Sequence, residues 1–172
     1  EGEDREAYME DVQLIQGYAE WNRHIIVREI LKGMKWKAVE QFSVAHNYMD
    51  GAGILHKGSI SAGSGERVII PVNMKEGVIL GTGKGNPEWN SSAPHGSGRR
   101  LKREEVKNRY TVSEFKKEMK GVYSSCVGAD TLDEAPFAYR SLTEIEEQIA
   151  DTVAITDILK PVYNFKAGNM RN

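Results

Sequence analysis

Cysteine is nearly absent from this chain of 172 residues, which holds a single one, Cys126. One thiol cannot form an internal disulfide, and chains without a disulfide framework are typical of the cytosol. Long apolar runs are lacking too. No stretch approaches the roughly 20 apolar residues that a membrane-spanning helix needs, and no secretory signal pattern is present. The sequence therefore predicts a cytoplasmic protein without a membrane segment.

An excess of charge of either sign is also lacking. The chain has 23 Lys and Arg against 25 Asp and Glu, a formal net charge of −2 at pH 7. This balance argues against a broad surface that coats nucleic acid, although it permits a local basic groove. The length and the ordinary apolar fraction predict a single domain, residues 1–172. The chain begins without Met, which predicts a processed product, an excised piece or a fragment.

Glycine, by contrast, is abundant and gathers in residues 81–99, which read GTGKGNPEWNSSAPHGSGR around His95. Because glycine raises the entropic cost of folding, this density indicates sharp turns or a backbone that closely approaches a ligand. Converging backbone N–H groups in such a loop can bind an anion, usually phosphate. The alternative is an ordinary loop with a hydrogen-bonded histidine. The spacing fits neither the dinucleotide fingerprint nor the Walker pattern.

Two runs of this stretch, GKGNPEWN at 83–90 and SAPHGSGR at 92–99, resemble the signature of the RtcB family of RNA-splicing ligases. That signature usually reads GKGNP(D/E)WN-x-SAPHGAGR, so Ser97 replaces the usual Ala. The HNY at 46–48 and the DEAPFAY at 133–139 are similar to two further elements of the family. The resemblance covers nearly the whole chain but only the C-terminal portion of the family's length.

The resemblance implies an α+β fold with mixed or antiparallel sheets flanked by helices. It also implies a GTP- and manganese-dependent ligase that acts on RNA, either tRNA halves or broken ends. Such an enzyme joins a 3′-phosphate or 2′,3′-cyclic phosphate end to a 5′-hydroxyl end. A histidine first takes GMP from GTP, and the GMP then passes to the RNA 3′-phosphate.

Roles follow from the resemblance, residue by residue. His95 is the nucleophile that accepts GMP, and His46 is a manganese ligand. The residues expected to bind GTP or GMP are Asn47, His95, Gly96, Ser97, Gly98, Arg99, Tyr139 and Lys166. Most metal ligands of the family lie in upstream elements that this chain lacks, so the N-terminal half of the ligase is an expected partner.

Two other readings stay open. One is a non-catalytic domain that binds a guanine nucleotide or a partner. The other is one half of a split or truncated ligase that is inactive alone. The residues themselves favour His95 as nucleophile, because a neutral imidazole already has a lone pair. Lys84 would first have to lose a proton, and Cys126 lies outside the loop.

Apolar spacing and stop signals predict the elements. Helices are expected at 6–31 with a stop at Gly33, at 111–120 with Thr111 and Glu114 as a capping box, and from Ser141 or Thr143 to about Leu159. Strands are expected at 36–45, which would deliver His46 and Asn47 to its end, in a hairpin over 54–62, and at 67–71 and 162–166.

Overall fold

The computed structural model describes residues 2–50 and 53–165. It divides the chain into two compact units, Glu1–Ser61 and Ala62–Asn172. Both units combine helices with antiparallel strands, so the α+β prediction is confirmed. The assignment of 1–172 to a single domain stays a prediction. Within the described ranges, every helix is too short or too polar to span a lipid bilayer.

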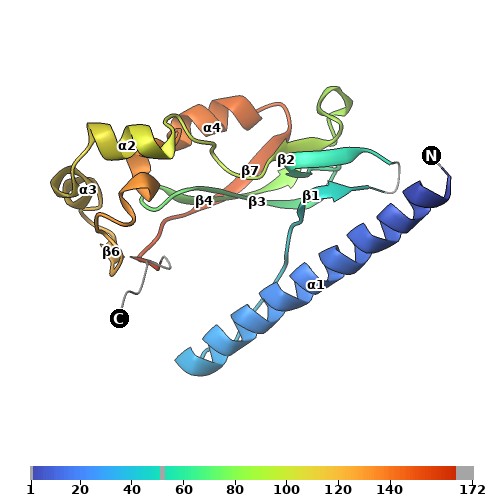
Figure 1. The fold of residues 1–172 in the computed structure, drawn as a ribbon, viewed down its shortest axis with the longest axis horizontal. Coiled ribbons are helices and arrows are strands. Elements are labelled where there is room, and N and C mark those ends of the chain that lie inside the picture. The colour runs from blue at the N-terminus through green and yellow to red at the C-terminus, as the bar shows by residue number, and fades with distance from the viewer. Residues whose placement is uncertain (1, 51–52, 166–172) are drawn as a thin grey trace. The chain divides into compact units, whose positions relative to one another are not determined.

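The first unit begins with helix α1, Glu3–Met34, which contains the predicted helix (Figure 1). The expected stop at Gly33 is wrong, because the helix continues through this residue. The helix ends at Lys35, whose φ of 56° is left-handed. That conformation lets the Trp36 N–H donate to the Leu31 carbonyl at 2.9 Å, which closes the last turn.

A hairpin of strands β1, His46–Met49, and β2, Leu55–Ser61, follows in the same unit. The predicted strand at 36–45 is wrong, since the described strand begins only at His46. The predicted hairpin over 54–62 is wrong as well, because these residues form one continuous strand. Gly58, which suggested a turn, instead donates its N–H across the hairpin to Asn47 Oδ1 at 2.7 Å.

The second unit is built on an antiparallel sheet in the order β3-β4-β7, with strands Arg67–Asn73, Gly77–Gly83 and Val153–Leu159 (Figure 1). Buried and less buried residues alternate along β3 and β4, as expected for strands with one covered face. Val68, Ile70 and Ile79 are fully buried, and they form the core side of this sheet.

The remaining elements of this unit are short. They are η1 (Pro87–Trp89), β5 (Ser92–Pro94), α2 (Arg103–Arg109), α3 (Val112–Glu118), β6 (Tyr123–Ser124), η2 (Leu132–Glu134), η3 (Pro136–Ala138), α4 (Leu142–Ile149) and β8 (Tyr163–Asn164). Apolar side chains of α2, α3, η2 and η3 share one buried cluster that includes Phe115 and Val106. This cluster fixes the segment that carries Tyr139, because Ala135 and Ala138 belong to it.

The predicted cap at Thr111 is confirmed, and Ser141, one of the two alternatives, caps the last helix, which is shorter than predicted. Thr111 and Ser141 each accept a hydrogen bond from the backbone N–H three residues on, as capping boxes do. Helix α4 ends at Ile149, and the residues up to Leu159 form strand β7 instead of more helix. Val153–Leu159 pairs with β4 along its length, and that pairing satisfies backbone groups that a longer helix would have satisfied internally.

Candidate functional site

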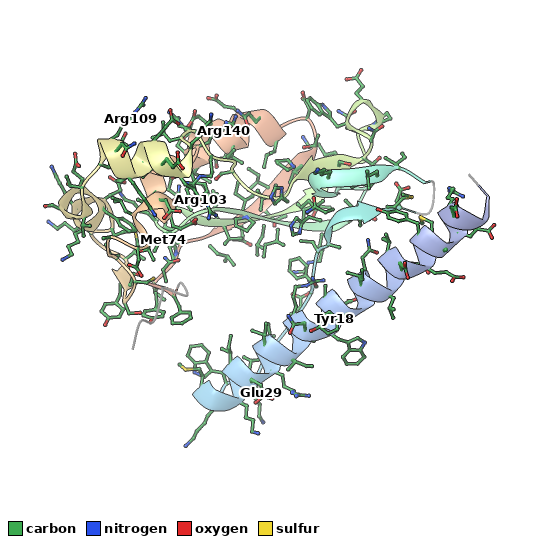
Figure 2. All side chains as sticks on the ribbon, viewed as in Figure 1. Tyr18, Glu29, Met74, Arg103, Arg109 and Arg140 are labelled. Carbon is green, nitrogen blue, oxygen red and sulfur yellow. The ribbon has the colours of Figure 1, made fainter. Side chains whose placement is uncertain are left out.

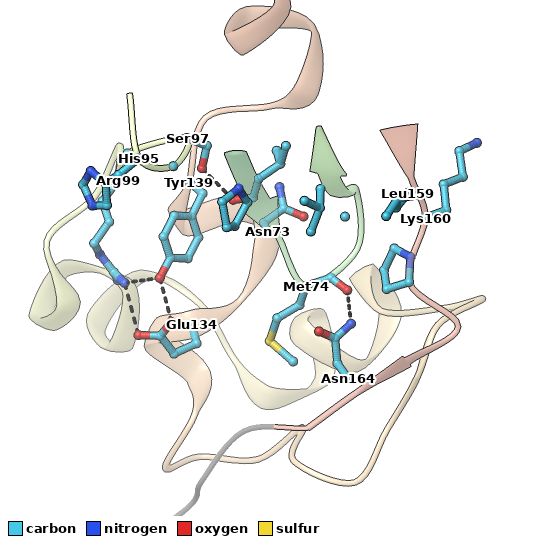
Figure 3. A pocket seen from close by; sticks show the side chains of 17 residues that line it. Asn73, Met74, His95, Ser97, Arg99, Glu134, Tyr139, Leu159, Lys160 and Asn164 are labelled. Carbon is cyan, nitrogen blue, oxygen red and sulfur yellow. Dashed lines mark hydrogen bonds and ion pairs between the residues drawn. The ribbon is translucent and has the colours of Figure 1, made fainter. Parts of the chain in front are cut away.

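A cavity of about 710 Å³ opens in the second unit, and the segment around His95 forms one of its sides (Figure 3). The ends of β3 and β4 and the chain that follows β7 form the opposite side. Of the residues predicted to bind the nucleotide, the cavity brings together His95, Gly96, Ser97, Gly98, Arg99 and Tyr139. Separate sequence motifs therefore meet around one volume.

The first glycines of the Gly-rich stretch serve packing. Gly81 and Gly83 lie within β4, and neither lines the cavity. A Cβ on Gly83 would lie 2.4 Å from the Ala62 carbonyl oxygen, and a Cβ on Gly81 would lie 2.7 Å from that of Ala154. These glycines are required because neighbouring backbone comes too close for any side chain.

The polar residues beside these glycines hold the turn between α4 and β7. The Lys84 ammonium donates to the Ala150 carbonyl, and its backbone N–H donates to Thr152 O at 2.9 Å. Asn86 Nδ2 donates to Asp151 O at 3.2 Å. Lys84 thus binds a carbonyl near the C-terminal end of a helix, where a cation is favoured. The GKGN part of the motif thus stabilises the turn between α4 and β7 through hydrogen bonds.

His95 directly follows β5, and its side chain is exposed at the cavity. The segment behind it is anchored by Ser97, which is 3% exposed. The Ser97 N–H donates to Pro71 O at 3.0 Å, and the Ser97 hydroxyl donates to Val72 O at 2.6 Å. The hydroxyl that distinguishes this chain from the usual signature is therefore satisfied by β3.

Gly98 favours glycine because its φ of 71° is left-handed. A Cβ at this position would also lie 2.5 Å from Nη1 at the end of the flexible Arg140 side chain, which would have to shift. Arg140 in turn donates to Ser97 O at 3.4 Å. The His95–Arg99 segment is thereby held against the chain around Arg140.

Arg99, Glu134 and Tyr139 form a hydrogen-bonded group on the cavity wall (Figure 3). Arg99 Nη1 donates to Tyr139 Oη at 2.9 Å and lies 3.5 Å from Glu134 Oε1. The Tyr139 hydroxyl donates to Glu134 Oε2 at 2.6 Å. The Arg99 guanidinium also lies over the tyrosine ring, 4.9 Å from its centroid. Each member is oriented by the other two.

The pKa of Tyr139 is raised to about 12, chiefly because burial disfavours the phenolate. The hydrogen bond to Glu134 and the negative charge of that carboxylate raise the pKa further. Arg99 acts in the opposite direction but is outweighed. Tyr139 therefore stays a neutral hydroxyl donor under physiological conditions.

We expect Tyr139 to ionise later than an ordinary tyrosine, and this ionisation to oppose folding. The folded state keeps the proton between about pH 10 and 12, whereas the unfolded chain loses it near pH 10. The stability that Tyr139 contributes is thus present below pH 10 and is lost as the pH rises through 12. Phenolate absorbance at 295 nm should show one late-titrating group that Tyr139→Phe removes. A late group that persists in this variant would contradict the assignment.

The opposite side of the cavity combines apolar and amide groups. Val72, Val78 and Leu159 contribute apolar surface, and Asn73 and Asn164 contribute side-chain amides. The Asn164 amide also donates to the Met74 carbonyl (Figure 3). A cavity with apolar walls and a few polar groups is the kind of site that binds a small organic ligand.

His46 and Asn47 lie in the other unit, at the start of β1. His46 is exposed and pairs across the hairpin with Ile60. Asn47 has a left-handed φ of 57°, and its side-chain oxygen accepts from Gly58 N–H. Their predicted roles stay predictions. Lys166 lies outside the described residues.

A manganese site is not complete in the described part of the chain. Within residues 2–50 and 53–165, no three His, Cys, Asp or Glu side chains gather in a way that could hold a metal ion. A transition metal needs several ligands at once. His46 alone does not fit such a site, and further ligands would have to come from elsewhere.

Sequence reasoning missed several residues of the cavity. Glu134 had a signal, because it belongs to the same DEAPFAY motif as Tyr139. Asn73, Lys160 and Asn164 had none, because each reaches the cavity only through the path of its strand.

Comparison with known proteins agrees with the motif resemblance. The family model described as tRNA-splicing ligase RtcB matches residues 1–167. The RNA-splicing ligase RtcB of Escherichia coli K12 is 25% identical over an aligned length of 173, which covers 90% of this chain and 42% of that protein. The RNA-splicing ligase RtcB1 of another Escherichia coli strain is 26% identical over 144 residues, 80% of this chain and 35% of that protein.

The chain thus spans about two fifths of the length of these relatives, or less. The family model nevertheless covers almost all of it, including the His95 segment, Tyr139 and the β1 start. The chain belongs to the RtcB family of tRNA-splicing ligases.

Proposed function

We propose that this chain carries the nucleotide-accepting part of a GTP-dependent RNA ligase. The ligase joins an RNA 3′-phosphate or 2′,3′-cyclic phosphate end to a 5′-hydroxyl end. The observation that supports this most is the position of His95. In a member of the RtcB family, it lies exposed on a cavity that Arg99 and Tyr139 also line.

In the proposed first step, a ring nitrogen of neutral His95 attacks the α-phosphorus of GTP. An N–P bond forms, the bond to the β-phosphate oxygen breaks, and pyrophosphate leaves. A 2′,3′-cyclic phosphate end first adds water, which breaks the bond to O2′ and gives a 3′-phosphate. The RNA 3′-phosphate then attacks the phosphorus bound to His95, which frees the imidazole and activates the RNA end. Finally the 5′-hydroxyl attacks the activated phosphate, loses its proton and displaces GMP.

The residues around His95 are assigned to binding. The Gly96 and Gly98 backbone approaches the phosphates, and Arg99 supplies positive charge to their oxygens. Glu134 offsets part of that charge, because it lies 3.5 Å from Arg99 Nη1. Tyr139 and Lys166 are assigned to the guanine, and Asn47 to a phosphate.

Manganese enters this proposal through the family resemblance. His46 is the one ligand that we assign in this chain, and no step is derived through the metal. The remainder of an RtcB ligase, supplied as a separate polypeptide, is the partner proposed to complete the site. A non-catalytic guanine-nucleotide-binding domain is the second candidate, favoured by the incomplete ligand set of the described residues.

An RNA-joining assay distinguishes the two candidates. The chain is combined with the remaining portion of an RtcB ligase, manganese, GTP and two RNA strands that end in a 3′-phosphate and a 5′-hydroxyl. The ligase proposal predicts a joined strand that requires both polypeptides and GTP. Nucleotide binding without joining under all these conditions would favour the non-catalytic domain.

The cavity is expected to prefer guanine to adenine by about tenfold or more, because Lys166 can donate to the O6 and N7 acceptors of guanine. The exocyclic amine of adenine would instead face the lysine with another donor. Calorimetric titration with GTP and ATP measures the ratio. Lys166→Ala should bring the two affinities together, whereas equal affinities in the unmodified chain would contradict the assignment.

A further inference from the structure

Two exposed tyrosines stack on each other at the two-stranded parallel sheet of β6 and β8. Tyr123 is paired in register with Tyr163, and the ring centroids lie 5.4 Å apart with an interplanar angle of 24°. Their exposed fractions are 69% and 49%. Both rings therefore present faces that are accessible from solvent.

The pair is held in place by its surroundings. The Tyr123 N–H donates to Val162 O at 3.3 Å, and Ser125 Oγ lies 3.0 Å from Tyr163 Oη in a hydrogen bond. Tyrosine loses little conformational freedom when it binds, and here both rings are already ordered. The two tyrosines thus form a ready platform, called the Tyr123–Tyr163 platform below.

The platform adjoins the cavity that holds His95. Asn164, the next residue of β8, lines that cavity and donates to the Met74 carbonyl. Successive side chains of a strand point to opposite faces, so β8 presents Asn164 to the cavity and Tyr163 to the other side. Lys160, three residues before Tyr163, lines the cavity as well.

Two exposed lysines lie close to the platform along the chain. Lys120 and Lys160 are each three residues from a platform tyrosine, so their Cα atoms lie within about 11 Å of it. The structure records no ion pair for Lys120 or Lys160 within its described ranges. Flat aromatic faces beside exposed lysines match a strand of bases and phosphates.

We propose that the Tyr123–Tyr163 platform is a stacking site for an unpaired base of the RNA strand whose end reaches His95. This assignment rests on the proposed function, and it names a contact for the RNA outside the nucleotide cavity. One base stacks on an outer tyrosine face, while Lys120 and Lys160 contact neighbouring phosphates. A second RtcB polypeptide covering the same surface is the alternative occupant.

Binding of single-stranded RNA to the chain, followed by fluorescence anisotropy without GTP, tests the site independently of guanylation. Tyr123→Ala or Tyr163→Ala should weaken binding at least about fivefold, as loss of base stacking does. Phe at either position should keep most of the affinity, because the ring remains. Tyr18→Ala is the matched control, since Tyr18 is 73% exposed on α1 (Figure 2) and belongs to the other unit.

An abasic RNA separates stacking from indirect effects. When the stacked base is removed, Tyr163→Ala should cause no further loss, because the base and the ring act as a pair. The proposal would be overturned if Tyr163→Ala weakened the binding of intact RNA and of every abasic RNA equally, or if the chain bound no RNA. The proposal would also be overturned if the alanine variants bound RNA normally but no longer bound the complementing RtcB polypeptide. Loss of guanylation with intact RNA stacking would instead contradict only the proposed function.

Discussion

Replacement of His95 by Ala should abolish transfer of GMP from GTP to the protein, a loss on the order of 10³-fold or more. The variant lacks the nitrogen that would bond to the α-phosphorus, and no neighbouring group replaces it. His95 is exposed, so its removal should leave the fold intact. The measurement follows label from [α-³²P]GTP onto this chain in the presence of manganese and the remaining portion of an RtcB ligase.

Lys84→Ala is the matched control for that experiment. Lys84 is the rival nucleophile within the glycine-rich stretch, but its ammonium donates to the Ala150 carbonyl and does not line the cavity. The control should label normally, although it should be less stable because α4 loses its C-terminal cation. The bond formed on His95 should be labile in acid and fairly stable in base. Full labelling of His95→Ala, or label found on Lys84, would refute the mechanism.

The part of the site that the sequence predicted is the part encoded by local motifs. Residues 95–99 are contiguous, so their arrangement around one turn follows from Gly98 and from the Ser97 bonds to β3. Tyr139 was predicted with them through the family resemblance, and an isolated bridge pairs it directly with Arg99. Asn73 and Asn164 could not be predicted, because only the strand ends bring them to the cavity.

The sequence predicted the fold best where a side chain acts on the backbone a few residues away. Thr111 and Ser141 cap helices because their side chains satisfy backbone donors beside them, which needs no tertiary partner. The end of α4 was misread because Ile145, Ile149 and Val153 continue a spacing of four. Val153 is buried for another reason, as the first residue of β7, and pairing with β4 overrode the helical spacing.

Glycine was the least specific signal in the sequence. The glycine-rich stretch at 81–99 suggested a single phosphate-binding loop. In the structure, its glycines belong to two different local structures. Gly98 lies at the cavity with a left-handed φ, whereas Gly83 lies in β4 against the backbone of Ala62. A glycine chosen for close packing and one chosen for ligand approach look identical in a sequence. Substitution distinguishes the two kinds of glycine, because replacing a packing glycine lowers stability, whereas replacing a glycine beside a ligand weakens binding.

Gly83→Ala should therefore destabilise the second unit by about 3 kcal/mol, because the new Cβ would lie 2.4 Å from the Ala62 carbonyl oxygen and backbone would have to move. Gly17→Ala is the matched control. It adds the same methyl group within α1, where nothing lies within 4 Å, and should stabilise the helix by about 0.5–1 kcal/mol. Urea unfolding followed by circular dichroism measures both changes. If Gly83 instead bound phosphate, its variant would unfold like the unmodified chain and lose affinity for GTP, an outcome that would contradict the packing role.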